Sequence, residues 1–179
     1  MRPRHLLIGV AAAVIGVPVA VVAVDAAVRW HPAPDAGIAA RVAAAPDLDA
    51  YLVAREDSVS GVKPALRKGI VWRDAARRTR TPLSIIYLHG FSASRAELSP
   101  VIERLADSLG ANLYFTRFTA HGRMDGEACA TLKPQQLVDD AREAFAIGRR
   151  IGDRVIVVAT SSGVPPTLQV VSESANSIA

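Results

Sequence analysis

The stretch VIVVATSSGVPP, residues 155–166, decides how the fold of this chain is interpreted. It begins with β-branched residues, which favour a buried strand, and continues into a small-x-Ser-x-small pentapeptide at 159–163. A serine between small residues on a sharp strand-to-helix turn is a nucleophile elbow, which projects the hydroxyl out of the sheet. Ala159 and Gly163 supply the small neighbours, so the pattern predicts that Ser161 is a nucleophile. An ordinary serine-rich turn is the alternative, while Ser162 fits poorly because Val164 would then stand at a small position.

The residues before this stretch alternate between strand and helix patterns. Apolar runs predict strands at 68–74, 83–90, 111–118 and 153–160. Helices are predicted over 94–110 and 133–152; in the first, Ser94 and Glu97 form a capping-box pattern, and Val101, Leu105 and Leu109 share one face. This alternation predicts an α/β fold, with a parallel sheet and helices on both of its faces. Ligands of such sheets bind at the carboxyl ends of the strands, where HGFS (89–92) and TSSG (160–163) are expected to meet.

The N-terminal residues 6–24, LLIGVAAAVIGVPVAVVAV, contain no charged side chain and follow the basic pentapeptide MRPRH. As a helix rising about 1.5 Å per residue, this run nearly spans a hydrocarbon core of about 30 Å. We interpret it as a membrane anchor, with Trp30 near the interface and the rest of the chain outside the cytoplasm. A cleaved export signal is the alternative, and VDA at 24–26 would be a weak cleavage site.

The sequence divides into three parts on these criteria. Residues 1–30 form the membrane anchor or signal segment, 31–67 a linker with one short helix, and 68–179 the α/β domain. Pro32 and Pro34 stiffen the linker. Its helix is predicted from the amphipathic segment DLDAYLVAREDSV, 47–59, with Asp47 or Asp49 as the N-cap.

Composition excludes several classes of function. The chain has 179 residues and a net charge of +4, and its basic residues are interleaved with acids except at 73–80, so we expect no nucleic-acid partner. Cys129 is the single cysteine, which rules out an internal disulfide and a cysteine metal cluster. No metal site and no cofactor are expected.

Three motifs, in this order, resemble the α/β-hydrolase family, and specifically its serine-aminopeptidase-like and monoacylglycerol-lipase-like branch. IIYLHGFSASRAEL, 85–98, resembles the strand and oxyanion loop of that branch. TRFTAHGRMDGEA, 116–128, is similar to the loop after its next strand, and VIVVATSSG, 155–163, to its nucleophile elbow. The resemblance extends over about residues 68–170 and implies a three-layer α/β-hydrolase-like fold.

The resemblance also implies roles for individual residues. Ser161 would attack a small or lipid-like carboxylic ester and form an acyl-enzyme. The backbone N–H groups of Phe91 and Ser162 would form the oxyanion hole. His89 and Gly90 would shape the oxyanion loop, and His121 would shape the loop after the next strand.

The chain departs from the family pattern after the elbow. In the family an acid and a histidine follow the nucleophile, but only Glu173 and no histidine follow Ser161. We therefore expect an incomplete domain, truncated after the elbow and inactive as this chain, with the strand at 153–160 left as an apolar edge. Pro165 and Pro166 fall in the expected helix, where Pro166 is expected to cost a hydrogen bond. A non-catalytic, membrane-anchored α/β binding module is the alternative function.

Overall fold

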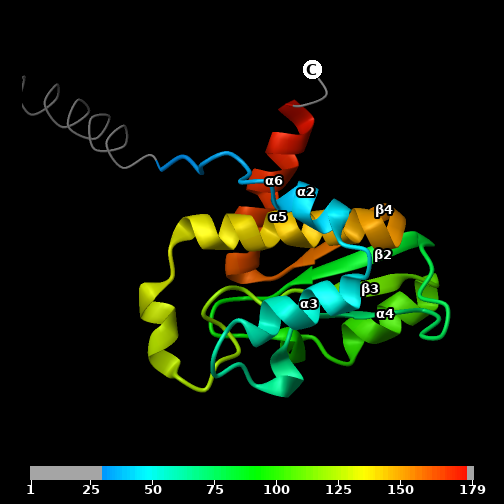
Figure 1. Ribbon diagram of the computed structural model, residues 1–179, viewed down its shortest axis with the longest axis horizontal. Helices are drawn as coiled ribbons and strands as arrows, with labels where there is room; N and C mark the ends of the chain where they lie inside the picture. The colour runs from blue at the N-terminus through cyan, green and yellow to red at the C-terminus, as the bar shows by residue number, and fades with distance from the viewer. Residues whose placement is uncertain (1–29, 177–179) are drawn as a thin grey trace, which may run out of the picture. The chain divides into compact units, whose positions relative to one another are not determined.

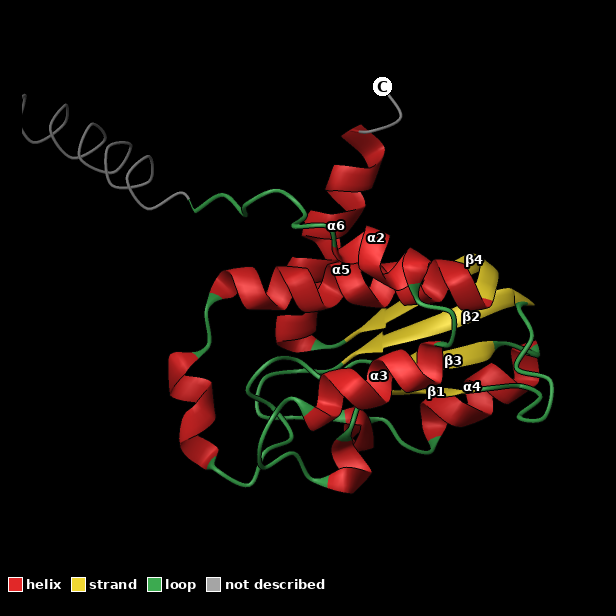
Figure 2. Cartoon of the chain, viewed as in Figure 1, coloured by secondary structure: helices red, strands yellow, loops and turns green. Residues whose placement is uncertain are grey.

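The computed structural model describes residues 30–176, and the described residues from Ala33 onward form one compact unit (Figure 1). This unit holds one sheet and the helices that cover it (Figure 2). The strands are β1 (Gly69–Val71), β2 (Thr81–Leu88), β3 (Asn112–Phe115) and β4 (Gly152–Ala159). The α-helices are α2 (Ile38–Ala44), α3 (Leu48–Asp57), α4 (Val101–Leu109), α5 (Pro134–Ile151) and α6 (Val164–Asn176). Four short 3-10 helices are η1 (Pro64–Leu66), η2 (Arg95–Glu97), η3 (Gly126–Thr131) and η4 (Ser161–Gly163).

The strands lie in the order β1-β3-β2-β4. β2 is parallel to both β3 and β4, which confirms the predicted parallel sheet for three of the strands. β1, which was predicted only as a short strand, runs antiparallel to β3. The connection from β1 to β2, residues 72–80, contains no helix, and a parallel arrangement needs a long crossover connection, usually a helix.

The sheet has a hydrophobic core on each face. Alternate residues of a strand point to opposite faces, so Ile86 and Leu88 of β2 pack with α5 on one side, whereas Ile85 and Tyr87 pack with α4 on the other. All four side chains are fully buried. Coverage on both faces explains why the sequence of β2 is a continuous apolar run rather than an alternating one.

Helix α4 begins later than the sequence pattern predicts, and the face that carries Val101, Leu105 and Leu109 is not its buried face. It begins at Val101, after η2, and its buried side chains are Ile102 and Ala106. The side chains of Val101, Leu105 and Leu109 are exposed instead. Both sets recur at the spacing of a helix face, and only the packing of the helix on the sheet decides which of them is buried.

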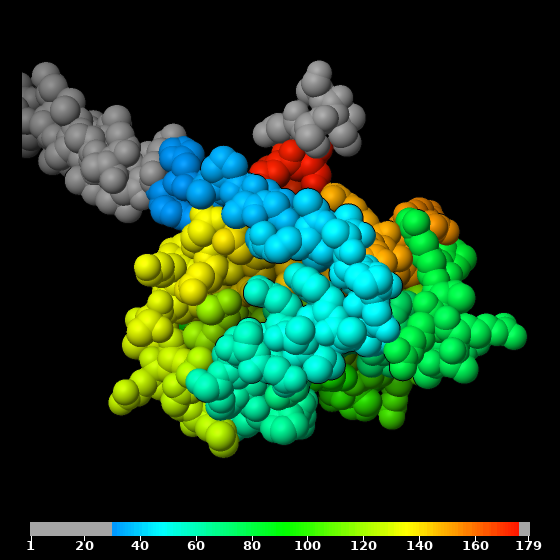
Figure 3. Space-filling model, viewed as in Figure 1, coloured from blue at the N-terminus to red at the C-terminus, as the bar shows by residue number. Residues whose placement is uncertain are grey.

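Residues 33–67 belong to the same compact unit as residues 68–179 and are not a separate linker. Val42, Leu48 and Leu52 are buried in the core that α5 shares with the sheet. The blue and cyan atoms of this segment lie directly against the yellow atoms of α5 (Figure 3). Asp47 caps α3 through a 3.0 Å hydrogen bond from the N–H of Ala50, which selects Asp47 over Asp49 as the N-cap.

A buried ion pair fastens α3 to the loop after β3. The Arg117 guanidinium donates Nε and Nη2 to the two carboxylate oxygens of Glu56, each at 2.8 Å. Both side chains are almost fully buried. Arg117 also donates to the carbonyl of His121 at 3.0 Å, so the same side chain fixes the course of that loop.

Two expectations concern the edges of the described chain. β4 is an edge strand of the described sheet, as expected for the strand at 153–160, and the side chains at 155–158 are only partly buried. The apolar run at 6–24 lies outside the described residues, so its role as an anchor stays a prediction. Among residues 30–176, no helix is both long and apolar enough to cross a membrane.

Replacing Glu56 by Ala should lower the free energy of unfolding by about 3–5 kcal/mol, because it leaves the Arg117 charge buried without a partner. The matched control is Asp57→Ala, which breaks an exposed ion pair with Arg67 and should cost less than about 1 kcal/mol. Urea denaturation of both variants measures the difference. Equal losses in the two variants would show that the Glu56 pair does not hold α3 in place.

Candidate active site

The candidate site lies at the carboxyl edge of the sheet, where three loops meet. His89, Gly90 and Phe91 follow β2, residues 116–122 follow β3, and Ser161 follows β4. The pairing extends to the loops, since the N–H of Thr160 donates to the carbonyl of Leu88 at 3.0 Å. This edge is the ordinary ligand-binding edge of an open α/β sheet.

Ser161 has a strained backbone at the turn between β4 and α6, the turn that the sequence predicted to be a nucleophile elbow. Its φ is 45°, in the left-handed region that serine seldom occupies. The residue opens η4, which leads directly into α6, and its side chain is exposed. Strain of about 1–3 kcal/mol persists only where the surrounding structure over-determines it, and it is concentrated at functional sites.

Close packing at position 163 explains why the pentapeptide 159–163 ends in glycine. A Cβ at this position would lie 2.6 Å from the carbonyl oxygen of Leu88 and 2.9 Å from that of His89. These are backbone atoms of a strand end that is paired on both sides, so they cannot move aside. The turn after β4 therefore approaches β2 closely only because residue 163 has no side chain.

The two prolines do not disturb this geometry. Helix α6 begins at Val164, so Pro165 and Pro166 lie in its first turn. Because η4 leads directly into α6 and the N–H of Val164 donates to the carbonyl of Ser161, the expected loss of a hydrogen bond at Pro166 stays a prediction. The Thr167 hydroxyl adds a 2.8 Å hydrogen bond to the carbonyl of Gly163, which ties the helix to the turn.

His89 is buried beneath the turn that follows β2, with both ring nitrogens held by backbone groups. Nδ1 donates to the carbonyl of Gly90 at 2.8 Å, and Nε2 accepts from the N–H of Phe118 at 3.2 Å. Burial lowers the pKa of His89 to about 4. These contacts leave the ring no free nitrogen to accept a proton from Ser161, and they suit a residue that shapes the loop.

The backbone N–H groups at the site differ in whether they donate a hydrogen bond. The N–H of Gly90 donates to the Glu97 carboxylate at 3.0 Å. Within residues 30–176, the N–H groups of Phe91 and Ser162 have no hydrogen-bond partner. The same two residues were expected to form an oxyanion hole. A methyl group on Gly90 would lie 3.4 Å from Cβ of Ser161, so the turn after β2 and the elbow are adjacent.

Glu97 is a residue of this site that the sequence analysis assigned to a helix cap. Its Oε2 accepts hydrogen bonds from the hydroxyl of Tyr87 at 2.6 Å, the N–H of Gly90 at 3.0 Å and the hydroxyl of Thr160 at 2.8 Å. The predicted capping box is therefore wrong, because the Glu97 carboxylate does not bind the backbone N–H of Ser94. The Ser94 side chain does accept a hydrogen bond from the N–H of Ala96. Local spacing favoured the cap, and no local signal points to Glu97 as the link between the ends of β2 and β4.

His121 packs on the other side of the turn after β2. Its ring lies edge-on to Phe91, with 5.6 Å between the ring centroids, and 5.1 Å from the ring of His89. Its Nδ1 donates to the carbonyl of Thr119 at 3.1 Å. Nε2 is buried and has no hydrogen-bond partner in the described part of the chain. The ring therefore packs against Phe91, and its loop-shaping role stays a prediction.

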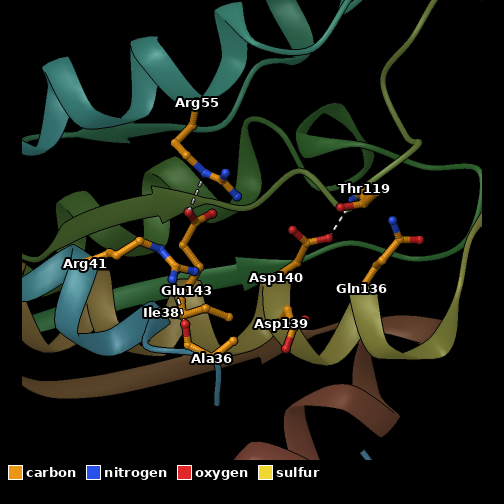
Figure 4. Close-up of a pocket in the computed structure, with 9 residues that line it drawn as sticks. All are labelled: Ala36, Ile38, Arg41, Arg55, Thr119, Gln136, Asp139, Asp140 and Glu143. Atoms are coloured by element: carbon orange, nitrogen blue, oxygen red, sulfur yellow. Dashed lines mark hydrogen bonds and ion pairs between the residues drawn. The ribbon is translucent and has the colours of Figure 1, made fainter. Parts of the chain in front are cut away.

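A polar cavity of about 220 Å³ lies between α2, α3 and α5, apart from the candidate site (Figure 4). Burial raises the pKa of Asp140, which accepts the N–H of Thr119 at 2.6 Å. Glu143 accepts hydrogen bonds from Tyr51, Arg55 and Lys68. Asp140 thus fastens α5 to the loop after β3, and Glu143 fastens α5 to α3 and to the residue before β1. Neither Ser161 nor Phe91 lines the cavity.

Among the described residues, no candidate base contacts the hydroxyl of Ser161 directly. No side chain between residues 30 and 176 forms a hydrogen bond with Ser161 Oγ. Glu173, the single acid after the elbow, lies on α6 in an ion pair with Arg142 at 2.7 Å. The described residues also contain no cluster of His, Cys, Asp or Glu suited to a metal ion.

No protein-family model matches the chain, and no curated protein matches its sequence. The case for the site therefore rests on its geometry.

Replacing Gly163 by Ala should destabilise the protein by at least about 1–3 kcal/mol, because the new methyl group overlaps two backbone carbonyls. The matched control is Gly126→Ala, since nothing lies within 4 Å of a Cβ at Gly126. Thermal unfolding of both variants is the measurement. A Gly163→Ala protein as stable as the control would mean that the elbow does not approach β2 in solution.

The His89 pKa of about 4, against an ordinary 6.5, makes the stability depend on pH. Between these values the unfolded histidine binds a proton and the folded one does not, so stability falls as the pH is lowered from 6.5 towards 4. The loss between pH 7 and pH 5 should be smaller in His89→Gln, which has no imidazole at this position. Urea titrations of both proteins at the two pH values test this. An identical loss would contradict a buried, neutral His89.

Proposed function

We propose that this chain carries the nucleophile and the oxyanion-binding groups of an α/β-hydrolase-type serine hydrolase that acts on small or lipid-like carboxylic esters. The observation that carries the proposal is the positive φ of Ser161 at the end of a parallel strand. The close approach of Gly163 to β2 supports it independently, because the elbow needs a small residue there. The resemblance of three motifs to this family points to the same chemistry.

The reaction would begin with attack of Ser161 Oγ on the ester carbonyl carbon. The carbonyl oxygen becomes negatively charged and would be stabilised by the free N–H groups of Phe91 and Ser162. Collapse of this intermediate breaks the bond to the alcohol, which leaves with a proton, and an acyl group remains on Ser161. Water would then release the acid.

Removal of the Ser161 proton is the step for which no described side chain is hydrogen-bonded to Ser161 in the resting structure. Both nitrogens of His89 are bound to backbone groups, and Glu173 is paired with Arg142. An unassisted serine hydroxyl is a weak nucleophile, and loss of a triad member costs several orders of magnitude in rate. We therefore propose a low intrinsic rate for this chain. That would leave a non-catalytic binding module as the alternative function.

The test compares wild type, Ser161→Ala and Ser162→Ala with p-nitrophenyl butyrate, with and without added imidazole as an external base. Without imidazole, turnover of the wild type should not exceed that of Ser161→Ala. With imidazole, intact-mass analysis should reveal butyryl-protein in wild type and Ser162→Ala, since alanine keeps the backbone N–H, but not in Ser161→Ala.

Equal acylation of Ser161→Ala and wild type would remove Ser161 as the nucleophile and favour the binding module. Rapid turnover without imidazole that disappears in Ser161→Ala would mean that the protein supplies its own base.

A further inference from the structure

Glu97 places a carboxylate beside the candidate nucleophile. A methyl group on Gly90 would lie 3.2 Å from Glu97 Oε1 and 3.4 Å from Cβ of Ser161. The two side chains therefore flank the same small space above the turn after β2. The distance from Oε1 to Cβ of Ser161 cannot exceed the sum of these two values.

The two oxygens of this carboxylate are differently engaged. Oε2 accepts three hydrogen bonds, from Tyr87, Gly90 and Thr160, which fix the orientation of the group. In the described part of the chain Oε1 has no hydrogen-bond partner, and Glu97 is exposed. Oε1 is therefore held in place and open to a ligand.

The charge of Glu97 is not balanced by a neighbouring cation. The hydrogen bonds from Tyr87 and Gly90 lower the pKa of Glu97, so it is ionised at neutral pH. No ion pair to Glu97 exists within residues 30–176. Arg95, two residues away, instead places its guanidinium 4.0 Å from the centre of the Phe115 ring.

We propose that Glu97 makes this site selective for esters whose acyl group carries an ammonium next to the carbonyl, as in aminoacyl esters. This inference rests on the proposed role of Ser161. An ammonium next to the carbonyl can donate a hydrogen bond to Oε1, which has no partner in the described chain. It also lies between the carboxylate and the oxyanion that forms on attack, and so offsets their repulsion. An anionic acyl group would be repelled by the same carboxylate.

Two isosteric esters test the proposal: p-nitrophenyl glycinate, which is cationic, and p-nitrophenyl propanoate, which is neutral. Intact-mass analysis follows acylation of Ser161 in the presence of imidazole, with Ser161→Ala as background. The variant Glu97→Gln keeps a carbonyl oxygen for the three donors and removes the charge. The control Asp153→Asn removes the same charge at the opposite end of β4, where the side chain is exposed.

The ratio of glycyl to propanoyl acylation should fall about three- to five-fold in Glu97→Gln and stay unchanged in Asp153→Asn. Comparing ratios between proteins cancels the different intrinsic reactivities of the two esters. Raising the salt concentration should reduce the wild-type ratio in the same direction, which provides a measurement that needs no variant. A ratio that neither Glu97→Gln nor salt changes would overturn the proposal and leave Ser161 as the nucleophile.

If neither ester acylates Ser161, the proposed function fails. The proposed cation site at Glu97 is then tested separately, by the binding of a small cationic amide. Glycinamide, which is cationic, should then shift the Gly90 amide signal in NMR spectra of the wild type but not of Glu97→Gln, and neutral propanamide should shift neither. Absence of the glycinamide shift would overturn the cation site as well.

Discussion

β2 is hydrogen-bonded to β3 on one side and to β4 on the other, and this double pairing determines where every site residue lies. A change in register would break both ladders and move each buried side chain to the opposite face. The N–H of Thr116 donates to the carbonyl of Tyr87, and that of Thr160 to the carbonyl of Leu88. The residues after β2 are therefore held between the loops that follow its two neighbours.

The loops themselves are held by different forces. Backbone close packing fixes the elbow, because Gly163 lies against two carbonyls of the β2 end. Buried polar contacts fix the loop after β3, where Arg117 binds Glu56 and Asp140 binds the N–H of Thr119. Removing one partner from such a buried network is costly, so α3 and α5 contribute to the site although neither reaches it.

The sequence predicted those features that a local pattern determines. Apolar runs located β2, β3, β4 and α5 within a few residues, and the small residues around Ser161 predicted the elbow turn with its helix. The buried face of α4 could not be read from spacing, because Ile102 and Ala106 recur as regularly as Val101 and Leu105. The place of α2 and α3 depends on a core completed by α5, about a hundred residues later.

The sequence did not reveal the role of Glu97, because this role also depends on contacts between distant residues. Its three donors are separated from it by 10, 7 and 63 residues, and only the fold brings the most distant of them, Thr160, to the same oxygen. The sequence offered a nearby partner for Glu97 in Ser94, and a capping box needs only local spacing. In the structure α4 begins later, at Val101, so Glu97 is not bound to a helix start.

The arrangement around Ser161 combines one favourable and one unfavourable electrostatic feature. In the proposed reaction, the free N–H groups of Phe91 and Ser162 would stabilise a negative charge, and the N-terminal end of α6 would further favour an anion there. The Glu97 carboxylate would oppose the same charge, and its Oε2 is also the acceptor that joins Tyr87, Gly90 and Thr160. With a neutral ester, the oxyanion would be stabilised by the two N–H groups and repelled by Glu97. With a cationic acyl group, the stabilisation by the N–H groups would remain and the repulsion by Glu97 would be weaker. Under the proposal, the residue that holds the turn after β2 against the elbow would also set the charge of the substrate that the site favours.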